Sequence, residues 1–146
     1  MRARISALLV HGREDRLQTV KPVLEALSIS CLRVRRCKEV ETRLAKIPPP
    51  HLVLTDTELP DGSWREVLAL AAKPPERVSV IVVSPVADMN LYLDVMNQGA
   101  YDFVTESFTV PELVHVLRCA VDNAVKAREP KRALLSQFEL CDARGE

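Results

Sequence analysis

The sequence of 146 residues predicts an α/β fold, a doubly wound five-stranded parallel sheet covered by five helices. Short runs rich in Val, Ile and Leu alternate with stretches in which apolar residues recur at helical spacing. The runs are apolar at consecutive positions, as in strands that helices cover on both faces. Because parallel strands are joined by right-handed crossovers, this alternation favours the strand order 2-1-3-4-5.

Five segments are expected to form the strands. Three runs of branched apolar residues are typical of central strands, and two weaker runs are expected to be outer or later strands. In chain order the five are Ile5–Val10, Ser30–Val34, Leu52–Leu54 leading into Thr55 and Asp56, Val78–Val83 and Asp102–Thr105.

Five apolar stripes at helical spacing accompany these strands, and each can cover one face of the sheet. Two proline clusters, Pro48–Pro50 and Pro74–Pro75, are expected to end the second and third helices. Proline lacks an amide hydrogen and disfavours helical geometry in the residue before it. The stripes are Leu17, Val20, Leu24 and Leu27; Val40, Leu44 and Ile47; Val67, Leu68 and Ala71; Leu91, Val95 and Met96; and Val110, Leu113, Val114, Leu117, Ala120, Val121, Ala124 and Val125.

The composition limits the class and the location of the protein. Twenty basic and twenty acidic residues cancel, so no overall positive field attracts nucleic acid. The four cysteines form neither a zinc-ligand pattern nor a secreted disulfide framework, and the apolar stretch near the N-terminus is too short for a signal peptide. We expect a cytoplasmic protein with one folded domain over residues 1–127 and a helical or flexible tail over residues 128–146.

Polar residues collect where the expected strands end. In a doubly wound sheet, ligands bind outside the carboxyl ends of the strands. Those ends carry His11 and Gly12 after the first strand, Asp56 after the third, Ser84 after the fourth and Glu106 after the fifth. The candidate site is therefore polar and mixed in charge.

Three segments resemble the receiver domains of bacterial response regulators. Residues 52–62, Leu-Val-Leu-Thr-Asp-Thr-Glu-Leu-Pro-Asp-Gly, are similar to the phosphoacceptor segment of that family. Residues 80–84, Val-Ile-Val-Val-Ser, resemble its fourth strand, and residues 99–104, Gly-Ala-Tyr-Asp-Phe-Val, resemble the approach to its fifth. The resemblance covers residues 5–127 and implies the flavodoxin-like receiver fold, with Asp56 as the candidate phosphoacceptor.

The resemblance also implies a cation site, from which this sequence departs. In the family, two acidic residues after the first strand, the acceptor aspartate and a backbone carbonyl two residues beyond it hold Mg²⁺, which offsets negative charge during phosphoryl transfer. The acidic pair corresponds to His11 and Gly12, neither of which is a carboxylate, and the carbonyl to Glu58. We expect weak Mg²⁺ binding, and Glu14 as a substitute ligand stays open.

The family's lysine after the fifth strand corresponds to Glu106. A carboxylate there reverses the sign of a Coulomb energy on the order of 1 to 4 kcal/mol. Glu106 as a relocated cation ligand and Glu106 as a solvated loop residue both stay open. Ser84 and Phe103 match the family's switch residues. An aromatic residue in a strand beside a helix is more often part of the core, and we favour this core role for Phe103.

His11 has three alternative roles at a strand end, as a metal ligand, a base or a phosphoacceptor. His51 is expected at the opposite edge of the sheet and His115 in the last helix, so the topology does not favour a histidine cluster. We expect a neutral His11 hydrogen-bonded to Asp56.

The resemblance implies a module of two-component phosphorelay signalling and not an enzyme, beyond weak self-phosphorylation and self-dephosphorylation at Asp56. We expect little or no phosphorylation, and regulation by a protein partner, a histidine kinase or a downstream effector, bound at residues 88–127. A homodimer stays open, and no nucleic acid or membrane partner is expected. The alternative is a working phosphoacceptor that uses Asp56 with a rearranged metal site. An unrelated enzyme lacks support, because no Gly-rich phosphate loop or nucleophile–base pair is found.

Overall fold

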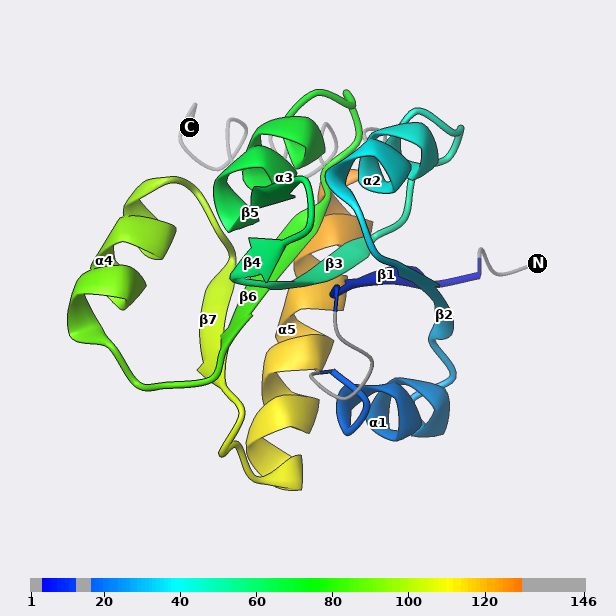
Figure 1. Cartoon of the computed structure of the whole chain (residues 1–146). Coiled ribbons are helices and arrows are strands. Elements are labelled where there is room, and N and C mark those ends of the chain that lie inside the picture. The colour runs from blue at the N-terminus through cyan, green and yellow to red at the C-terminus, as the bar shows by residue number, and fades with distance from the viewer. Residues whose placement is uncertain (1–3, 13–16, 130–146) are drawn as a thin grey trace, which may run out of the picture.

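The computed structural model describes residues 4–12 and 17–129. Its main sheet has five parallel strands in the order β2-β1-β3-β6-β7, which is the predicted 2-1-3-4-5 order when the strands of this sheet are counted along the chain (Figure 1). The predicted fold class is therefore confirmed. The strands are β1 Ser6–Val10, β2 Ser30–Val34, β3 Leu52–Asp56, β6 Ser79–Ser84 and β7 Asp102–Thr105.

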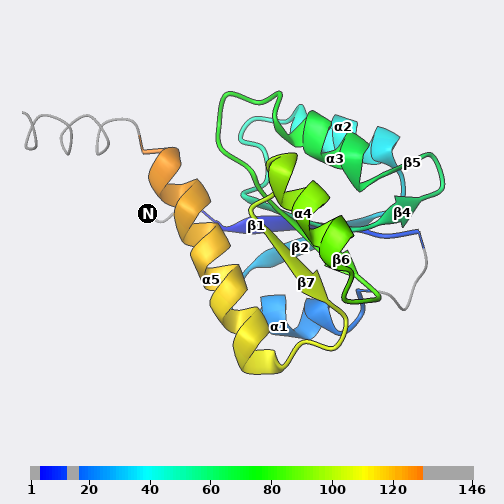
Figure 2. The same cartoon turned by 90° about the vertical axis from the view of Figure 1, so that its left-hand side faces the viewer.

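Helices cover both faces of the sheet (Figures 1 and 2). Helices α1 (Val20–Ala26) and α5 (Val110–Ala127) pack on one face, and α2 (Cys37–Leu44), α3 (Trp64–Ala71) and α4 (Met89–Asn97) pack on the other. Among the residues that the structure describes, no helix is long and apolar enough to cross a membrane.

Alternate residues of the central strands enter two separate cores. Leu52, Leu54 and Ile81 belong to the core under α1 and α5, whereas Val53 and Val82 belong to the core under α2, α3 and α4. All five side chains are fully buried. Burial on both faces explains why the central strands have nearly continuous apolar sequences.

The second helix is shorter than its apolar stripe predicted. Helix α2 ends at Leu44, and Ile47 is 89% exposed, so its assignment to the core stripe was wrong. Pro48 disfavours helical geometry at Ile47, and the chain leaves the helix before that residue. In the first stripe, Leu17 is buried although it lies before α1.

A small hairpin that the sequence patterns did not predict follows β3. Strand β4 (Glu58–Leu59) pairs antiparallel with β5 (Gly62–Ser63). The Asp61 carboxylate in its turn accepts hydrogen bonds from the backbone N–H groups of Cys37, at 2.7 Å, and Lys38, at 3.2 Å. Asp61 thus caps α2 from outside that helix and ties the hairpin to it.

Candidate functional site

The register of the sheet brings three predicted site residues to one edge. Val10 pairs with Thr55, and Asp56 pairs with Val83, so His11, Asp56 and Ser84 occupy neighbouring positions at the carboxyl ends of β1, β3 and β6. The exposed fractions of these three residues are 2%, 5% and 0%. The polar groups of the site are therefore largely shielded from water. Other groups of the same chain must supply most of their hydrogen bonds.

The Asp56 carboxylate is held by the residue that follows it. Its Oδ1 atom accepts a hydrogen bond from the backbone N–H of Thr57 at 2.7 Å, and the Thr57 hydroxyl lies 3.5 Å from the same oxygen. The Thr55 hydroxyl donates to the Asp56 carbonyl at 2.9 Å. These local bonds fix the carboxylate at the end of β3.

Gly12 lies directly against the hairpin. A Cβ atom added at Gly12 would be 2.9 Å from Cδ and 3.2 Å from Cγ of Pro60. The proline ring is rigid, so a side chain at position 12 requires the hairpin to shift. The contact was not predicted, because Gly12 and Pro60 are far apart in the sequence and no periodic pattern links them.

The Ser84 hydroxyl bonds to the loop after β6. It donates to the Val86 carbonyl at 2.8 Å, and its oxygen lies 3.2 Å from the Val86 backbone N–H. The backbone N–H of Glu106 donates to the Ser84 carbonyl at 2.9 Å, while the Glu106 side chain is exposed. The loops after β6 and β7 are therefore joined through Ser84.

Phe103 packs between the sheet and α4. It is partly buried against the core under α2, α3 and α4, and its ring meets that of Tyr92 edge to face, with centroids 5.7 Å apart. Edge-to-face contact is a favourable arrangement for two aromatic rings. Phe103 is thus in contact with the core while it also touches a residue of α4.

The acidic candidates do not form a metal-binding group of three side chains among the described residues. Within the described parts of the chain, no three His, Cys, Asp or Glu side chains are grouped so that they could hold a metal ion. The side chains of Asp56 and Glu106 therefore belong to no such group of three, while the predicted contribution of Glu58 is its backbone carbonyl. Glu14, the proposed substitute ligand, lies outside the described residues.

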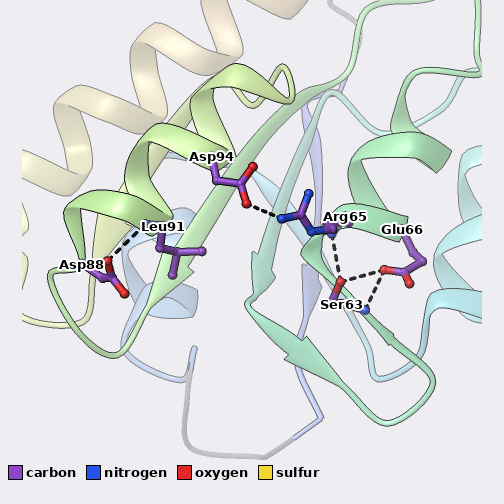
Figure 3. A network of polar contacts seen from close by, with 6 residues as sticks. All are labelled: Ser63, Arg65, Glu66, Asp88, Leu91 and Asp94. Atoms are coloured by element: carbon purple, nitrogen blue, oxygen red, sulfur yellow. Dashed lines mark hydrogen bonds and ion pairs between the residues drawn. The ribbon is translucent and has the colours of Figure 1, made fainter.

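A polar network beside the site links α3 to α4 (Figure 3). The Arg65 guanidinium forms an ion pair with Asp94 of α4 and stacks over the Trp64 ring, 4.6 Å from its centroid. Ser63 and Glu66 form a capping box that begins α3. Sequence patterns could not pair Arg65 with Asp94, because the two residues belong to different helices.

His51 and His115 lie away from the candidate site. His51 precedes β3, at the amino end of the strands, where its Nδ1 atom accepts a hydrogen bond from the Ser6 backbone N–H at 3.3 Å. His115 lies on α5, and its Nε2 atom is 3.8 Å from the Cys119 sulfur. His11 is the histidine that the fold places beside Asp56.

Comparison with known proteins agrees with the family resemblance. No model of a known protein family matches the chain. The chain is 26% identical over 129 residues to the response regulator protein PilR of Pseudomonas aeruginosa. The matched segment covers 88% of this chain and 28% of PilR. It is 21% identical over 84 residues to the DNA-binding transcriptional regulator NtrC of Proteus hauseri. That segment covers 58% of this chain and 18% of NtrC.

Solved structures show the same fold. The signal receiver domain of an HD domain-containing protein from Pseudomonas fluorescens matches with a TM-score of 0.74 and 24% identity, over 85% of this chain and 99% of that one. A response regulator receiver domain protein from Clostridium thermocellum matches with a TM-score of 0.70 and 20% identity, over 82% of this chain and 95% of that one. The receiver resemblance read from the sequence is confirmed. The chain spans less than a third of the length of PilR and NtrC.

Proposed function

We propose that this chain, which has the sequence pattern and the fold of a response-regulator receiver domain, acts as a signalling module through protein contacts, with little or no phosphorylation at Asp56. The contact between Gly12 and Pro60 carries the proposal. It closes the position at which the family places an acidic ligand for Mg²⁺.

Phosphoryl transfer to a carboxylate requires positive charge near the acceptor. The attacking oxygen and the phosphoryl group are both negative, and a bound cation offsets their repulsion in the transition state. His11 and Gly12 supply no carboxylate to bind such a cation. Glu106 adds negative charge where the family has a lysine. The site therefore disfavours a phosphoryl group both because it lacks carboxylates to bind a cation and because Glu106 repels negative charge.

An exposed apolar row on α4 supports protein contact as the output. Met89 and Leu93, one helical turn apart, are 69% and 50% exposed, and Val86 before the helix is 59% exposed. The ion pair between Arg65 and Asp94 links this helix to α3. We propose that the partner, a histidine kinase, a downstream effector or a second copy of the chain, binds Met89 and Leu93, within residues 88–127, together with Val86 just before them.

A second candidate function is a working phosphoacceptor with a rearranged metal site. The buried Asp56 at the end of β3 and the hydroxyl of Ser84 on the neighbouring strand favour it. Glu14 or Glu106 then supplies the missing cation ligand. In this reading the protein phosphorylates and dephosphorylates itself slowly at Asp56.

The intact mass of the protein after incubation with acetyl phosphate and Mg²⁺ separates the two functions. The proposal predicts no phosphoryl adduct on the parent protein or on the Asp56→Asn control. An adduct that forms on the parent and is lost in Asp56→Asn supports the working phosphoacceptor and refutes the proposal. Glu14→Gln and Glu106→Gln then identify the substitute ligand.

A further inference from the structure

The zero net charge of the chain conceals an uneven distribution of charge. Residues 17–50, which form α1, β2 and α2, contain seven basic and three acidic residues. Residues 51–129, which form the rest of the described fold, contain six basic and twelve acidic residues. The β2 side of the molecule is therefore positive, and positive surfaces attract acidic partners.

Strand β2 is an edge strand of the sheet. Among the described residues it pairs with β1 alone. The Ser30 N–H donates to Ile5, and the Val34 carbonyl accepts from His11, so alternate residues beginning at Ser30 point their backbone groups toward β1. In a parallel ladder the residues between them point the other way. The backbone groups of Cys31 and Arg33 therefore face the outer edge.

A groove of about 330 Å³ runs beside this edge on the α2 face. It is lined in part by Leu32, Arg43 and Lys46, and Leu32 is 41% exposed. Within residues 4–12 and 17–129, neither Arg43 nor Lys46 forms an ion pair. The groove thus combines an apolar floor with two cations.

The two cations of the groove lie beside the first half of β2. Arg43 and Lys46 line the groove together with Ser6 and Ser30, the first residues of β1 and β2. Leu32 occupies the middle of β2 and lies on the same face of the sheet as these two cations, whereas Arg33, the next residue, points to the opposite face. The groove therefore offers apolar surface with positive charge beside it.

We propose that the outer edge of β2 binds an extended acidic segment of a partner protein as an added strand. The backbone of the segment pairs with Cys31 and Arg33, and its central apolar side chains cover Leu32. Its carboxylates meet Arg43 and Lys46. Main-chain pairing supplies affinity in such complexes, and side-chain contacts supply specificity. This surface is independent of Asp56 and of the α4 row.

A fluorescein-labelled peptide, Glu-Glu-Val-Thr-Val-Glu-Glu, tests the proposal by fluorescence anisotropy. We expect saturable binding that weakens as salt is raised, because exposed charge pairs are screened. The double variant Arg43→Glu, Lys46→Glu is expected to weaken binding about tenfold. The control, Arg118→Glu with Lys126→Glu on α5, makes the same change of charge elsewhere and is expected to leave binding unchanged.

Amide hydrogen exchange tests the added strand itself. Peptide binding is expected to slow exchange at Cys31 and Arg33, with little change at Leu32, whose N–H already faces β1. Three outcomes overturn the proposal: no binding up to about 1 mM peptide, equal affinity for a peptide with Lys in place of Glu, or binding without slower exchange at Cys31 and Arg33. Slower exchange at these amides with rising protein concentration and no peptide would assign the edge to a second copy of the chain instead.

Discussion

Gly12 and Pro60 meet between two loops, and in the function proposed above this contact closes the position of an acidic cation ligand. The Pro60 ring occupies the space that a side chain at position 12 needs. On this proposal, a carboxylate introduced at position 12 is not sufficient to create a cation ligand. Pro60 has to move as well.

The variant Gly12→Asp tests this at a single residue. Overpacking by the new side chain is expected to lower the free energy of unfolding by about 1–3 kcal/mol, measured by urea denaturation. The double variant Gly12→Asp, Pro60→Ala removes the obstructing ring and is expected to regain most of this stability relative to Pro60→Ala alone. A Gly12→Asp protein as stable as the parent contradicts the account of the contact.

His51 makes stability depend on pH. Burial and the nearby Arg128 guanidinium lower the pKa of His51, and its Nδ1 atom accepts a hydrogen bond that a protonated ring cannot accept. The unfolded chain then binds the proton more readily than the folded protein. The contribution of His51 is complete above about pH 6.5, the pKa of an exposed imidazole, and is lost as the pH falls below it.

Urea denaturation at pH 7.5, 6.5 and 5.5 measures this dependence. The parent is expected to lose stability across the interval. His51→Asn keeps an acceptor for the Ser6 N–H but cannot be protonated, so its stability is expected to fall less. Identical slopes in the two proteins would show that His51 does not control the dependence.

At the residue scale, the sequence could place Asp56, His11 and Ser84 at one edge, because strand ends and their order follow from local patterns. It could not reveal the contacts of Gly12 with Pro60 or of Arg65 with Asp94. Each of these joins loops or helices that are distant in the chain, and neither leaves a periodic signal.

At the scale of elements, the end of α5 is attached to loops at the amino ends of the strands. The Arg128 guanidinium donates to the carbonyl groups of Arg77 and Pro49, both at 2.9 Å, and of Pro50, at 2.6 Å. One side chain thus donates hydrogen bonds to three carbonyl groups in two loops. The expected domain boundary at residue 127 falls just before this anchor.

Replacement of Arg128 tests how strongly this anchor holds the helix. Arg128→Met keeps much of the side-chain length but removes every donor, and we expect a loss of about 1–3 kcal/mol from the free energy of unfolding. Arg128→Lys keeps the charge but not the planar arrangement of donors, so an intermediate loss is expected. A loss below the error of thermal and urea denaturation for Arg128→Met would contradict the anchor.

The positions of some helices and strands could be predicted from the sequence better than those of others. Strands such as β3 and the long helix α5 have strong apolar patterns, and their predicted and observed positions agree closely. The strands β4 and β5 have two residues each, too few for a period to show. The end of α2 depends on Pro48, whose effect reaches back to Ile47 and excludes it from the helix.

At the scale of the whole molecule, the sheet order could be predicted because few topologies join parallel strands by right-handed crossovers. Chemistry at the carboxyl edge follows less directly from the fold. The same sheet can carry a complete cation site or, as proposed for this chain, one whose ligand positions are neutral or filled by the hairpin. The charge separation between the β2 side and the rest of the molecule likewise depends on side chains and not on topology.

The central claim is that the site around Asp56 does not hold a divalent cation. The most direct test is a titration of the ¹⁵N-labelled protein with Mn²⁺, a paramagnetic substitute for Mg²⁺, with Asp56→Asn as the control. The account predicts that the amide signals of Asp56, Thr57 and Ser84 broaden no more than those beside exposed carboxylates elsewhere in the protein, and equally in both proteins. Selective broadening of these three signals at low Mn²⁺, lost in Asp56→Asn, would contradict it.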